Sequence, residues 1–361
     1  LPTLQGGGAE KVISSLALSF DKKKYIIYIL VFNLSKQIYL KKKKIRIINL
    51  KANKIRSGVF KFIKFINKIK PDVIMSTVSH LNLMISLIKF FLPKKTKLVA
   101  RESNFLSKNL ELQSNSVIMR FFYKLFYNNF DLSLVFSNSH KKDIIENTNL
   151  KKKKIKILHN PVDFNLISKL SQKKINNKYK KFFLNNSKKF IFVGSLSFQK
   201  GIDIFIEILN KCKNKNFIYN IIGNGSELQS LKKLVREKKL QNNINFIPYQ
   251  SNPFPYIALS DAYVMSSRFE GMSNIVLETL VLKKPIIFFD GIGASTQLLK
   301  KMKNAYLLKK DIKNFSEKFI DSKRLRNSKS SNISYLKKFS IQNVVKSYEK
   351  TIDDLLKKDK V

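Results

Sequence analysis

Residues 262–289 read AYVMSSRFEGMSNIVLETLVLKKPIIFF, and this stretch decides the fold. The apolar runs at 262–265 and 285–289 predict buried strands, and residues 274–282 between them predict a helix. A strand, a helix and a second strand in this order indicate a parallel sheet covered by helices on both faces. The loop after the first strand then lies at the carboxyl end of the sheet, where open parallel sheets bind ligands.

The same alternation continues along the chain on either side of a break. After residue 189, the pattern predicts strands at 190–193, 217–222 and 244–247 and helices at 202–211 and 227–238. Before the break, it predicts strands at 25–32, 72–75, 97–100 and 132–136 and helices at 59–69, 81–92 and 117–130. The break consists of HNPVD at 159–163 and a Lys/Asn-rich stretch that follows it.

Two such series joined by a turn-rich segment predict an α/β protein with two Rossmann-like lobes. We expect an N-terminal lobe at 1–160 and a C-terminal lobe at 161–340. A last helix, at 341–361, is expected to cross back over the first lobe. The chain opens at Leu1 with the loop-like LPTLQGGGAE, so we expect the strand before this loop to be missing.

Composition excludes two broad classes of protein. With 44% hydrophobic and 12% aromatic residues, the 361-residue chain can bury a core, which excludes wholesale disorder. The longest nearly apolar run, 25–34, is about half of the roughly 20 residues that a spanning helix needs. The one cysteine, Cys212, fits a reducing compartment. We therefore expect a cytoplasmic protein, peripheral on the inner face of the membrane if it meets one.

The charge is strongly basic, with 70 Lys+Arg against 24 Asp+Glu and a net charge of +46. Only eight of these residues are Arg, the side chain on which nucleic-acid recognition mostly relies, and Lys is spread over the whole chain. We interpret the excess as biased composition on solvated faces, and expect no specific nucleic-acid partner. The charge still predicts attraction to anionic membrane surfaces.

Four loops that could bind an anion or a sugar stand out. Gly7 and Gly8 precede a helical pattern, Ser195 and Lys200 follow the strand at 190–193, and Gly223 follows the strand at 217–222. The Gly223 turn lacks the third glycine of a dinucleotide fingerprint, so we interpret it as a tight turn beside a ligand. Each loop taken alone is equally compatible with an ordinary turn.

The fourth loop, 266–278, is the most informative. Glu270 and Glu278 lie eight positions apart, on either side of a helix start that Ser273 or Asn274 would cap. Backbone amides there can hold a diphosphate while the carboxylates bind sugar and ribose hydroxyls, which suits a nucleotide sugar. Arg268 is one of only eight arginines and is a candidate for a task that Lys cannot do. A helix cap followed by a solvated Glu is the simpler explanation of the same residues.

Together these segments resemble glycosyltransferase family 4, the retaining enzymes with the GT-B fold. The segments that match in order and spacing are GGAEKV, HNPVD, FVGSLSFQKGID, IIGNGSEL, NPFPYIALSDAYVMSSRFEG and the E-x7-E pair that GMSNIVLE completes. The motif in the form GMSNIVLE is similar to that of bacterial enzymes that build lipid-linked glycans and surface polysaccharides such as lipopolysaccharide. The resemblance implies two Rossmann-like lobes whose parallel sheets face each other across a cleft.

The resemblance also implies roles for individual residues. Glu270 and Lys200 would be catalytic, Lys200 by stabilising the departing diphosphate, and Glu278 would bind the ribose. Glu102, next to Arg101, is a further catalytic candidate because it follows a strand of the acceptor lobe. The remaining donor contacts would come from Gly7, Gly8, Ser195, Gly223, Arg268, Gly271, Met272, Ser273, Asn274 and Ile275.

The predicted activity is transfer of a hexose or N-acetylhexosamine from a UDP- or GDP-sugar to a lipid-linked or other surface-glycan acceptor. No resident cofactor is expected, and since the sequence contains no D-x-D, no metal site is expected either. Ser195, Gln297 and Ala305 depart from the usual Arg, Glu and Gly of the family. These departures keep open a degenerate GT-B protein without activity. The sequence is also compatible with a synthase acting on soluble acceptors and with a nucleic-acid-binding protein.

The stretches 59–69 and 117–130 are amphipathic, with basic or aromatic residues. They predict core-facing helices of the first lobe. A second interpretation is docking on a membrane surface, which suits a lipid-linked acceptor. The two interpretations are compatible, because Lys side chains can face lipid while the apolar stripe packs inward.

Overall fold

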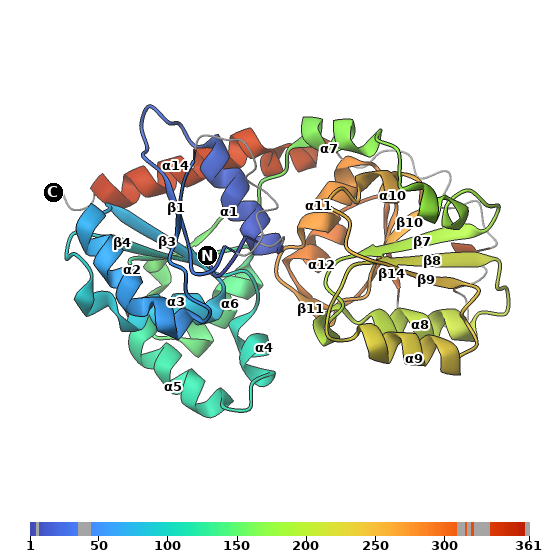
Figure 1. Ribbon diagram of the computed structural model, residues 1–361, viewed down its shortest axis with the longest axis horizontal. Helices are drawn as coiled ribbons and strands as arrows, with labels where there is room; N and C mark the ends of the chain where they lie inside the picture. The colour runs from blue at the N-terminus through green and yellow to red at the C-terminus, as the bar shows by residue number, and fades with distance from the viewer. Residues whose placement is uncertain (5–6, 35–44, 309–314, 316–318, 321–332, 358–361) are drawn as a thin grey trace. The chain divides into compact units, whose positions relative to one another are not determined.

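The computed structural model describes residues 1–4, 7–34, 45–308, 315, 319–320 and 333–357 (Figure 1). The chain divides into two compact units. The first, the N-lobe, comprises Leu1–Pro161 and Lys338–Val361, and the second, the C-lobe, comprises Val162–Lys337. The chain therefore enters the C-lobe after Pro161 and returns to the N-lobe at Lys338. In the described part of the chain, no helix is both long and apolar enough to span a bilayer.

The N-lobe contains parallel strands flanked by helices. Its strands are β1 (Tyr28–Val31), β2 (Arg46–Asn49), β3 (Val73–Thr77), β4 (Lys97–Arg101), β5 (Leu132–Val135) and β6 (Ile155–Ile157). Its α-helices are α1 (Gly8–Ser19), α2 (Ile55–Ile69), α3 (Ser79–Leu87), α4 (Leu106–Glu111), α5 (Ser116–Phe126), α6 (Asn138–Asn147) and α14 (Ile341–Lys357). Short 3₁₀ helices are η1 (Lys89–Phe91), η2 (Tyr127–Asn129), η3 (Lys152–Lys154) and η8 (Lys337–Phe339).

The larger sheet of the N-lobe has the order β3-β4-β5-β6, and β1 pairs with β2 separately. The first residues of the chain run along β1. The Leu1 amino group donates to the Leu30 carbonyl at 2.8 Å, and the Phe32 N–H donates to the Leu1 carbonyl at 3.2 Å. Leu1 and Pro2 therefore lie beside β1 in the manner of a neighbouring strand.

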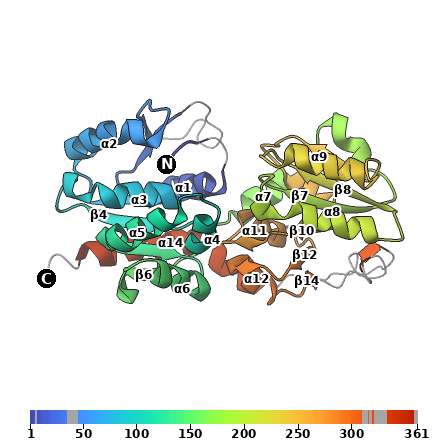
Figure 2. The same cartoon turned by 90° about the horizontal axis from the view of Figure 1, so that it is seen from below.

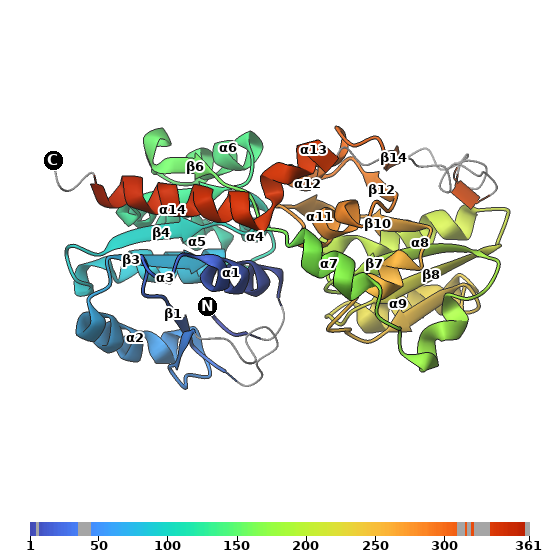
Figure 3. The same cartoon turned by 90° about the horizontal axis from the view of Figure 1, so that it is seen from above.

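Helices cover the N-lobe sheet on both faces, because its central strands are apolar on both sides. One apolar cluster joins Val12 and Leu16 of α1 to Val344 and Tyr348 of α14. A second cluster draws its residues from α2, α3, α4 and α5. Figures 2 and 3 show α14 beside α1, with α3 and α5 on the other side of the strands. Residues 358–361 of the predicted last helix lie outside the described residues.

The C-lobe is built around one parallel sheet with the order β14-β12-β10-β7-β8-β9. The strands of this sheet are β7 (Lys188–Val193), β8 (Phe217–Ile222), β9 (Ile244–Ile247), β10 (Ala262–Met265), β12 (Ile286–Phe289) and β14 (Ala305–Leu308). Two short strands, β11 (Phe269–Glu270) and β13 (Ile292–Gly293), pair with each other separately. The helices of the C-lobe are α7 (Phe164–Ser171), η4 (Asn177–Phe182), η5 (Phe198–Lys200), α8 (Ile202–Lys211), α9 (Leu228–Glu237), α10 (Phe254–Ala258), α11 (Asn274–Val281), α12 (Ala294–Leu299) and α13 (Ile333–Leu336). All four residues of β10 are buried, as expected of a strand covered on both faces.

The prediction of an α/β protein with two lobes of parallel strands is confirmed, and several bounds differ. The predicted helix 81–92 is α3 followed by η1, because Pro93 ends the helical segment. The predicted helix 117–130 likewise ends as η2. The Lys/Asn-rich stretch contains α7, which the sequence analysis missed. Asp163 caps α7 by accepting the Leu166 N–H at 2.9 Å, and this Asp before spaced apolar residues was a usable signal.

Candidate functional site

The loops after β10, β7 and β8 lie next to one another, because these three strands are neighbours in the C-lobe sheet. They contain Lys200, Gly223 and Glu270, which the sequence assigned to three separate motifs. All three loops leave the carboxyl ends of parallel strands, where such sheets bind ligands. The order of the strands therefore brings residues that are up to seventy positions apart in sequence to one edge of the sheet.

The turn after β8 is packed directly on the turn after β7. A Cβ atom on Gly223, whose φ is +148°, would overlap the carbonyl oxygen of Gly194. A Cβ on Gly225 would overlap the carbonyl oxygen of Leu196, and the Leu196 N–H donates to Asn224 at 2.9 Å. The sequence-based prediction of a tight turn is confirmed, and close backbone approach is the reason that glycine stands there.

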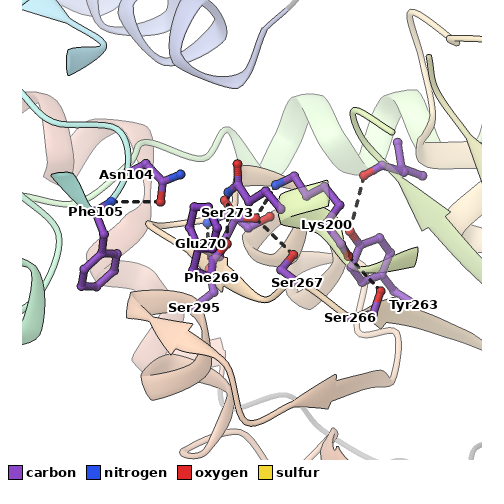
Figure 4. Close-up of polar contacts among 12 residues, drawn as sticks. Asn104, Phe105, Lys200, Tyr263, Ser266, Ser267, Phe269, Glu270, Ser273 and Ser295 are labelled. Carbon is purple, nitrogen blue, oxygen red and sulfur yellow. Dashed lines mark hydrogen bonds and ion pairs between the residues drawn. The ribbon is translucent and has the colours of Figure 1, made fainter. Parts of the chain in front are cut away.

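Lys200 and Glu270 form an ion pair between η5 and β11 (Figure 4). Their side chains are 18% and 11% exposed, so the pair is partly screened from water while it still reaches the surface. The Ser267 hydroxyl donates to the Glu270 carboxylate at 3.4 Å, and the Ser266 hydroxyl donates to the Lys200 carbonyl at 3.0 Å. Both predicted catalytic residues of the C-lobe are therefore brought together, which sequence spacing alone did not indicate.

Glu270 lies in the short strand β11, where the sequence placed a loop. It pairs with Gly293 of β13 in a parallel bridge. Gly293 has a φ of +156°, and a Cβ there would overlap the Glu270 carbonyl oxygen. The backbone that carries the Glu270 carboxylate is thus held from the neighbouring loop.

Arg268 was predicted to bind the donor, and its guanidinium is already engaged within the protein. It makes two hydrogen bonds to Asp203 of α8, at 3.0 and 2.6 Å, and a third to the Phe198 carbonyl at 2.8 Å. The guanidinium carbon also lies 4.1 Å from the Phe198 ring centroid. Its backbone N–H donates to Gln199 at 2.9 Å. Arg268 therefore positions η5, the turn that ends in Lys200, and a direct donor contact remains a prediction.

The start of α11 follows Gly271 and Met272. Ser273 is the residue before the helix, but its side chain makes no capping hydrogen bond. Its N–H donates to the Ser295 hydroxyl at 2.8 Å, and the Gly271 carbonyl accepts from the Ser295 N–H at 3.2 Å. The segment 271–275 is therefore fastened to α12, with Asn274 and Ile275 opening α11.

Glu278 lies on α11 and is 5% exposed. The nearby Tyr263 of β10 is buried, and the pKa of its hydroxyl is raised by burial and by the negative charges of Glu270 and Glu278. The two carboxylates of the E-x7-E pair thus stand on β11 and on α11, before and after the start of that helix.

Ser195 and Gln297 are exposed on the C-lobe, Ser195 after β7 and Gln297 on α12. Ala305 begins β14. Of the two residues of this loop that the sequence analysis selected, Ser195 is neutral and Lys200 is positively charged.

Gly7 and Gly8 stand at the start of α1, and a carboxylate of the chain itself lies there. Glu10 accepts the Gly7 N–H at 3.0 Å and also binds the Thr3 hydroxyl. A carboxylate at a helix start is favoured by the helix dipole, as a phosphate would be. A contact of these glycines with the donor remains a prediction.

Glu102 is completely buried in the N-lobe. Its carboxylate accepts hydrogen bonds from Ser79 at 2.9 Å, from Asn82 at 2.6 Å and from the Tyr127 hydroxyl. Burial raises its pKa, and these hydrogen bonds oppose that shift. Glu102 therefore ties β4 to α3 and η2. Its catalytic role stays a prediction.

Arg101 is also buried, 1% exposed, and points to neutral partners. Its guanidinium donates to the Thr77 hydroxyl at 3.1 Å and to the Asn160 side chain at 2.6 Å, and it lies 5.0 Å from the Phe136 ring centroid. Asn160 belongs to HNPVD, just before the chain enters the C-lobe. The sequence analysis missed this link, because nothing in the local pattern connects residues 59 positions apart.

Two family models together cover most of the chain. The model for Glycosyltransferase Family 4 matches residues 6–166, and that for Glycosyl transferases group 1 matches residues 171–339. The chain is a GT4-like glycosyltransferase. The two matched segments meet between the N-lobe and the C-lobe, so each model corresponds to one lobe.

Individual relatives agree with this family. An uncharacterized glycosyltransferase of Methanocaldococcus jannaschii is 31% identical over 248 residues, which are 66% of this chain and 60% of the relative's length. N-acetylgalactosamine-N,N'-diacetylbacillosaminyl-diphospho-undecaprenol 4-alpha-N-acetylgalactosaminyltransferase of Campylobacter jejuni is 24% identical over 306 residues, 82% of this chain and 81% of the relative.

Solved structures share the fold of this glycosyltransferase. The crystal structure of Anabaena HepE in complex with UDP-glucose superposes with a TM-score of 0.77 and 17% identity, covering 97% of both chains. The predicted GT-B fold is confirmed by this likeness.

Proposed function

We propose that this glycosyltransferase moves a sugar from a UDP-sugar to a lipid-linked or surface-glycan acceptor, with retention of the anomeric configuration. The observation that carries the proposal is the Lys200–Glu270 ion pair, with Glu278 on the following helix α11, at the carboxyl end of the C-lobe sheet. The UDP-glucose in the HepE crystal structure supports the donor class. The diphospho-undecaprenol acceptor in the name of the Campylobacter relative supports the acceptor class.

In this proposal each residue acts on one part of the donor. Glu278 accepts hydrogen bonds from the ribose hydroxyls, and Glu270 accepts them from the sugar. As the bond between the anomeric carbon and the diphosphate oxygen breaks, negative charge grows on the diphosphate. Lys200 and the amide groups at the start of α11 stabilise that charge, and this lowers the barrier. The acceptor hydroxyl forms the new bond on the same face of the sugar and passes its proton to the departing diphosphate oxygen.

The Lys200–Glu270 pair suits this role physically. The Glu270 carboxylate holds the Lys200 side chain in place, and a diphosphate can bind the ammonium group as a second anion. Transfer is proposed to rely on these side chains without a metal, because the sequence lacks the D-x-D pattern.

The first test is thermal unfolding of the chain with a panel of UDP- and GDP-sugars. A donor at a hundredfold excess over its Kd should stabilise the protein by about 2.7 kcal/mol. Glu278→Ala should abolish the shift, whereas Glu237→Ala, an exposed carboxylate of α9, should leave it intact. Addition of EDTA should change nothing. If no nucleotide sugar stabilises the folded protein, the proposal fails and a degenerate GT-B protein is the better description.

The second test addresses the acceptor and the stereochemistry. With the donor identified, transfer to an acceptor in lipid vesicles should exceed transfer to the same glycan without a lipid, and the product should have the donor's anomeric configuration by NMR. Equal rates on soluble glycans would favour a synthase that acts on soluble acceptors.

A further inference from the structure

The helices α2, η1 and α5 of the N-lobe carry large apolar side chains that face solvent. Among the described residues, the four phenylalanines more than 60% exposed are all found there: Phe60 at 84%, Phe90 at 81%, Phe91 at 66% and Phe121 at 61%. Val117 and Ile118 of α5 are 79% and 60% exposed. We call these six residues the docking face.

The core does not need these side chains, because the same helices already bury others. On α2, Phe62 and Ile66 point into the core cluster while Phe60 points outward. On α5, Tyr123 is buried while Phe121 is exposed. Both helices therefore have an apolar face inside, and in addition α2 exposes Phe60 and α5 exposes several apolar side chains. The ordinary amphipathic pattern, with one apolar stripe and a polar opposite face, does not account for this.

The parts of the docking face belong to one layer of the N-lobe. Asn67 of α2 donates to the Phe91 carbonyl of η1 at 2.9 Å, so these two elements are neighbours. The helix α3 contacts both η1 and α5. Figure 2 shows α2, α3 and α5 side by side in this view of the N-lobe.

The charge around the docking face is almost wholly positive. Residues 54–130 contain 14 Lys and Arg but only 3 Asp and Glu, a balance of 14 − 3 = +11. Of the three acids, Glu102 is buried and Glu111 pairs with Lys108 at 2.7 Å. On α2 the exposed charges are Arg56, Lys61, Lys64 and Lys68. Arg56 lies in the first turn, where the helix dipole disfavours a cation, so helix stability does not explain it.

Exposed apolar side chains among cations characterise helices that lie in the interface of an anionic bilayer. The long stems of lysine can follow the apolar surface while their charges reach lipid headgroups. A nucleic acid would also attract the cations, but aliphatic Val117 and Ile118 offer its bases no stacking surface. A second copy of this chain would bring an equally positive face and be repelled. Lipid is the occupant that matches both the apolar and the charged residues.

We propose that the docking face binds the surface of an anionic lipid bilayer, inserting its phenylalanines among the headgroups. The purpose, presenting a lipid-linked acceptor to the N-lobe, rests on the proposed function, but the binding does not. The two can therefore fail separately.

The test is co-sedimentation of the full chain with vesicles of phosphatidylglycerol and phosphatidylcholine, and with phosphatidylcholine alone. Binding is expected with the anionic vesicles. Phe60→Gln with Phe121→Gln should weaken it about tenfold or more, because apolar area no longer leaves water. Replacing Lys61, Lys64 and Lys68 by Gln should weaken it by roughly fivefold per residue.

Matched controls lie on the C-lobe. Leu166→Gln with Leu184→Gln removes two exposed apolar residues there, at 49% and 65% exposure, and should leave binding unchanged. Exchanging the exposed Lys211, Lys213 and Lys239 for Gln removes the same charge and should cost less than twofold. If the lysine variants of both lobes lose vesicle binding equally, the binding depends only on the net charge of the protein, and the proposal is overturned.

Three other results would also overturn it. These are absence of vesicle binding, a dimer in solution that Phe121→Gln dissolves, and an RNA that binds the docking face more tightly than the vesicles do. The donor-induced thermal shift should be unchanged in the docking-face variants. If vesicles bind but no nucleotide sugar stabilises the protein, the docking face stands and the proposed transferase function fails.

Discussion

The two lobes share one plan, parallel strands with helices on both faces, yet they place charged residues at the strand ends differently. In the C-lobe, Lys200 and Glu270 form a pair that still reaches the surface. In the N-lobe, Arg101 ends β4, Glu102 follows it, and both are buried among neutral partners. Charged residues at the ends of parallel strands can thus be buried within a lobe, as Arg101 and Glu102 are, or stay within reach of solvent, as Lys200 and Glu270 do.

The largest expected effect is a difference in stability between glycine variants of the two lobes. Gly223→Ala should destabilise the C-lobe by about 4 kcal/mol or more, because its Cβ would overlap the Gly194 carbonyl and its φ is +148°. Gly7→Ala should cost less than about 0.5 kcal/mol, since its Cβ would lie 3.6 Å from the Glu10 side chain. Urea unfolding measures both. Equal effects would mean that the two loops are equally constrained.

The second prediction tests whether Lys200, whose side chain still reaches the surface, contributes to sugar transfer. Lys200→Met should lower kcat/KM for sugar transfer by about 10²–10³-fold, the usual cost of losing one group that stabilises a departing oxyanion. Lys211→Met, an exposed lysine at the end of α8, is the control and should leave kcat/KM unchanged. Retained activity in Lys200→Met, measured with the donor found by thermal shift, would remove Lys200 from the mechanism.

The third prediction concerns acid, because all three histidines lie in the N-lobe. Burial lowers the pKa of His140 to about 4. The unfolded chain takes up this proton near pH 6.5 and the folded chain only near pH 4. N-lobe stability should therefore fall by up to about 3 kcal/mol as the pH drops through this window.

Hydrogen exchange of β5 in the N-lobe and β8 in the C-lobe, corrected for intrinsic rates, measures this difference. The raised pKa of Glu102 acts in the opposite direction, since its folded form holds a proton more tightly and loses stability as the pH rises. Burial also lowers the pKa of His159 to about 4, so the variant His140→Phe should reduce the pH dependence of β5 without abolishing it. An unchanged slope in that variant would contradict the assignment.

The smallest effect is expected at Arg268. Arg268→Lys loses the two-point contact with Asp203 and should lower kcat/KM about tenfold by loosening the turn that carries Lys200. The donor's Kd should change less than kcat if Arg268 only positions that turn. Arg236→Lys, at an exposed site on α9, should be silent. A large loss of donor affinity in Arg268→Lys would instead make Arg268 a direct ligand.

Much of the C-lobe could be predicted from sequence, because its strands are short apolar runs bounded by glycine turns. The bounds of α8, β8, β9 and β10 agree with the prediction. The N-lobe was less predictable. Its connections pass through 3₁₀ turns such as η1 and η2, which continue the apolar spacing of the preceding helix after the helix has ended.

The candidate site was likewise predictable only in part. The E-x7-E spacing indicated two carboxylates on either side of one helix start, and α11 begins at Asn274, between Glu270 and Glu278. No local pattern indicated that Asp203 would occupy the Arg268 guanidinium, because the two residues meet only when α8 packs beside the loop after β10.

The lobes, the order of strands and helices and the glycine turns at the strand ends could be predicted, because they follow from local periodicity and backbone conformation. Which charges face solvent depends instead on the packing of distant segments. Arg101 and Glu102 are adjacent in sequence, and their burial depends on Asn160, Asn82 and Tyr127, which other segments supply. Desolvation of a charge is a property of everything packed around it, so no local stretch of sequence can specify it.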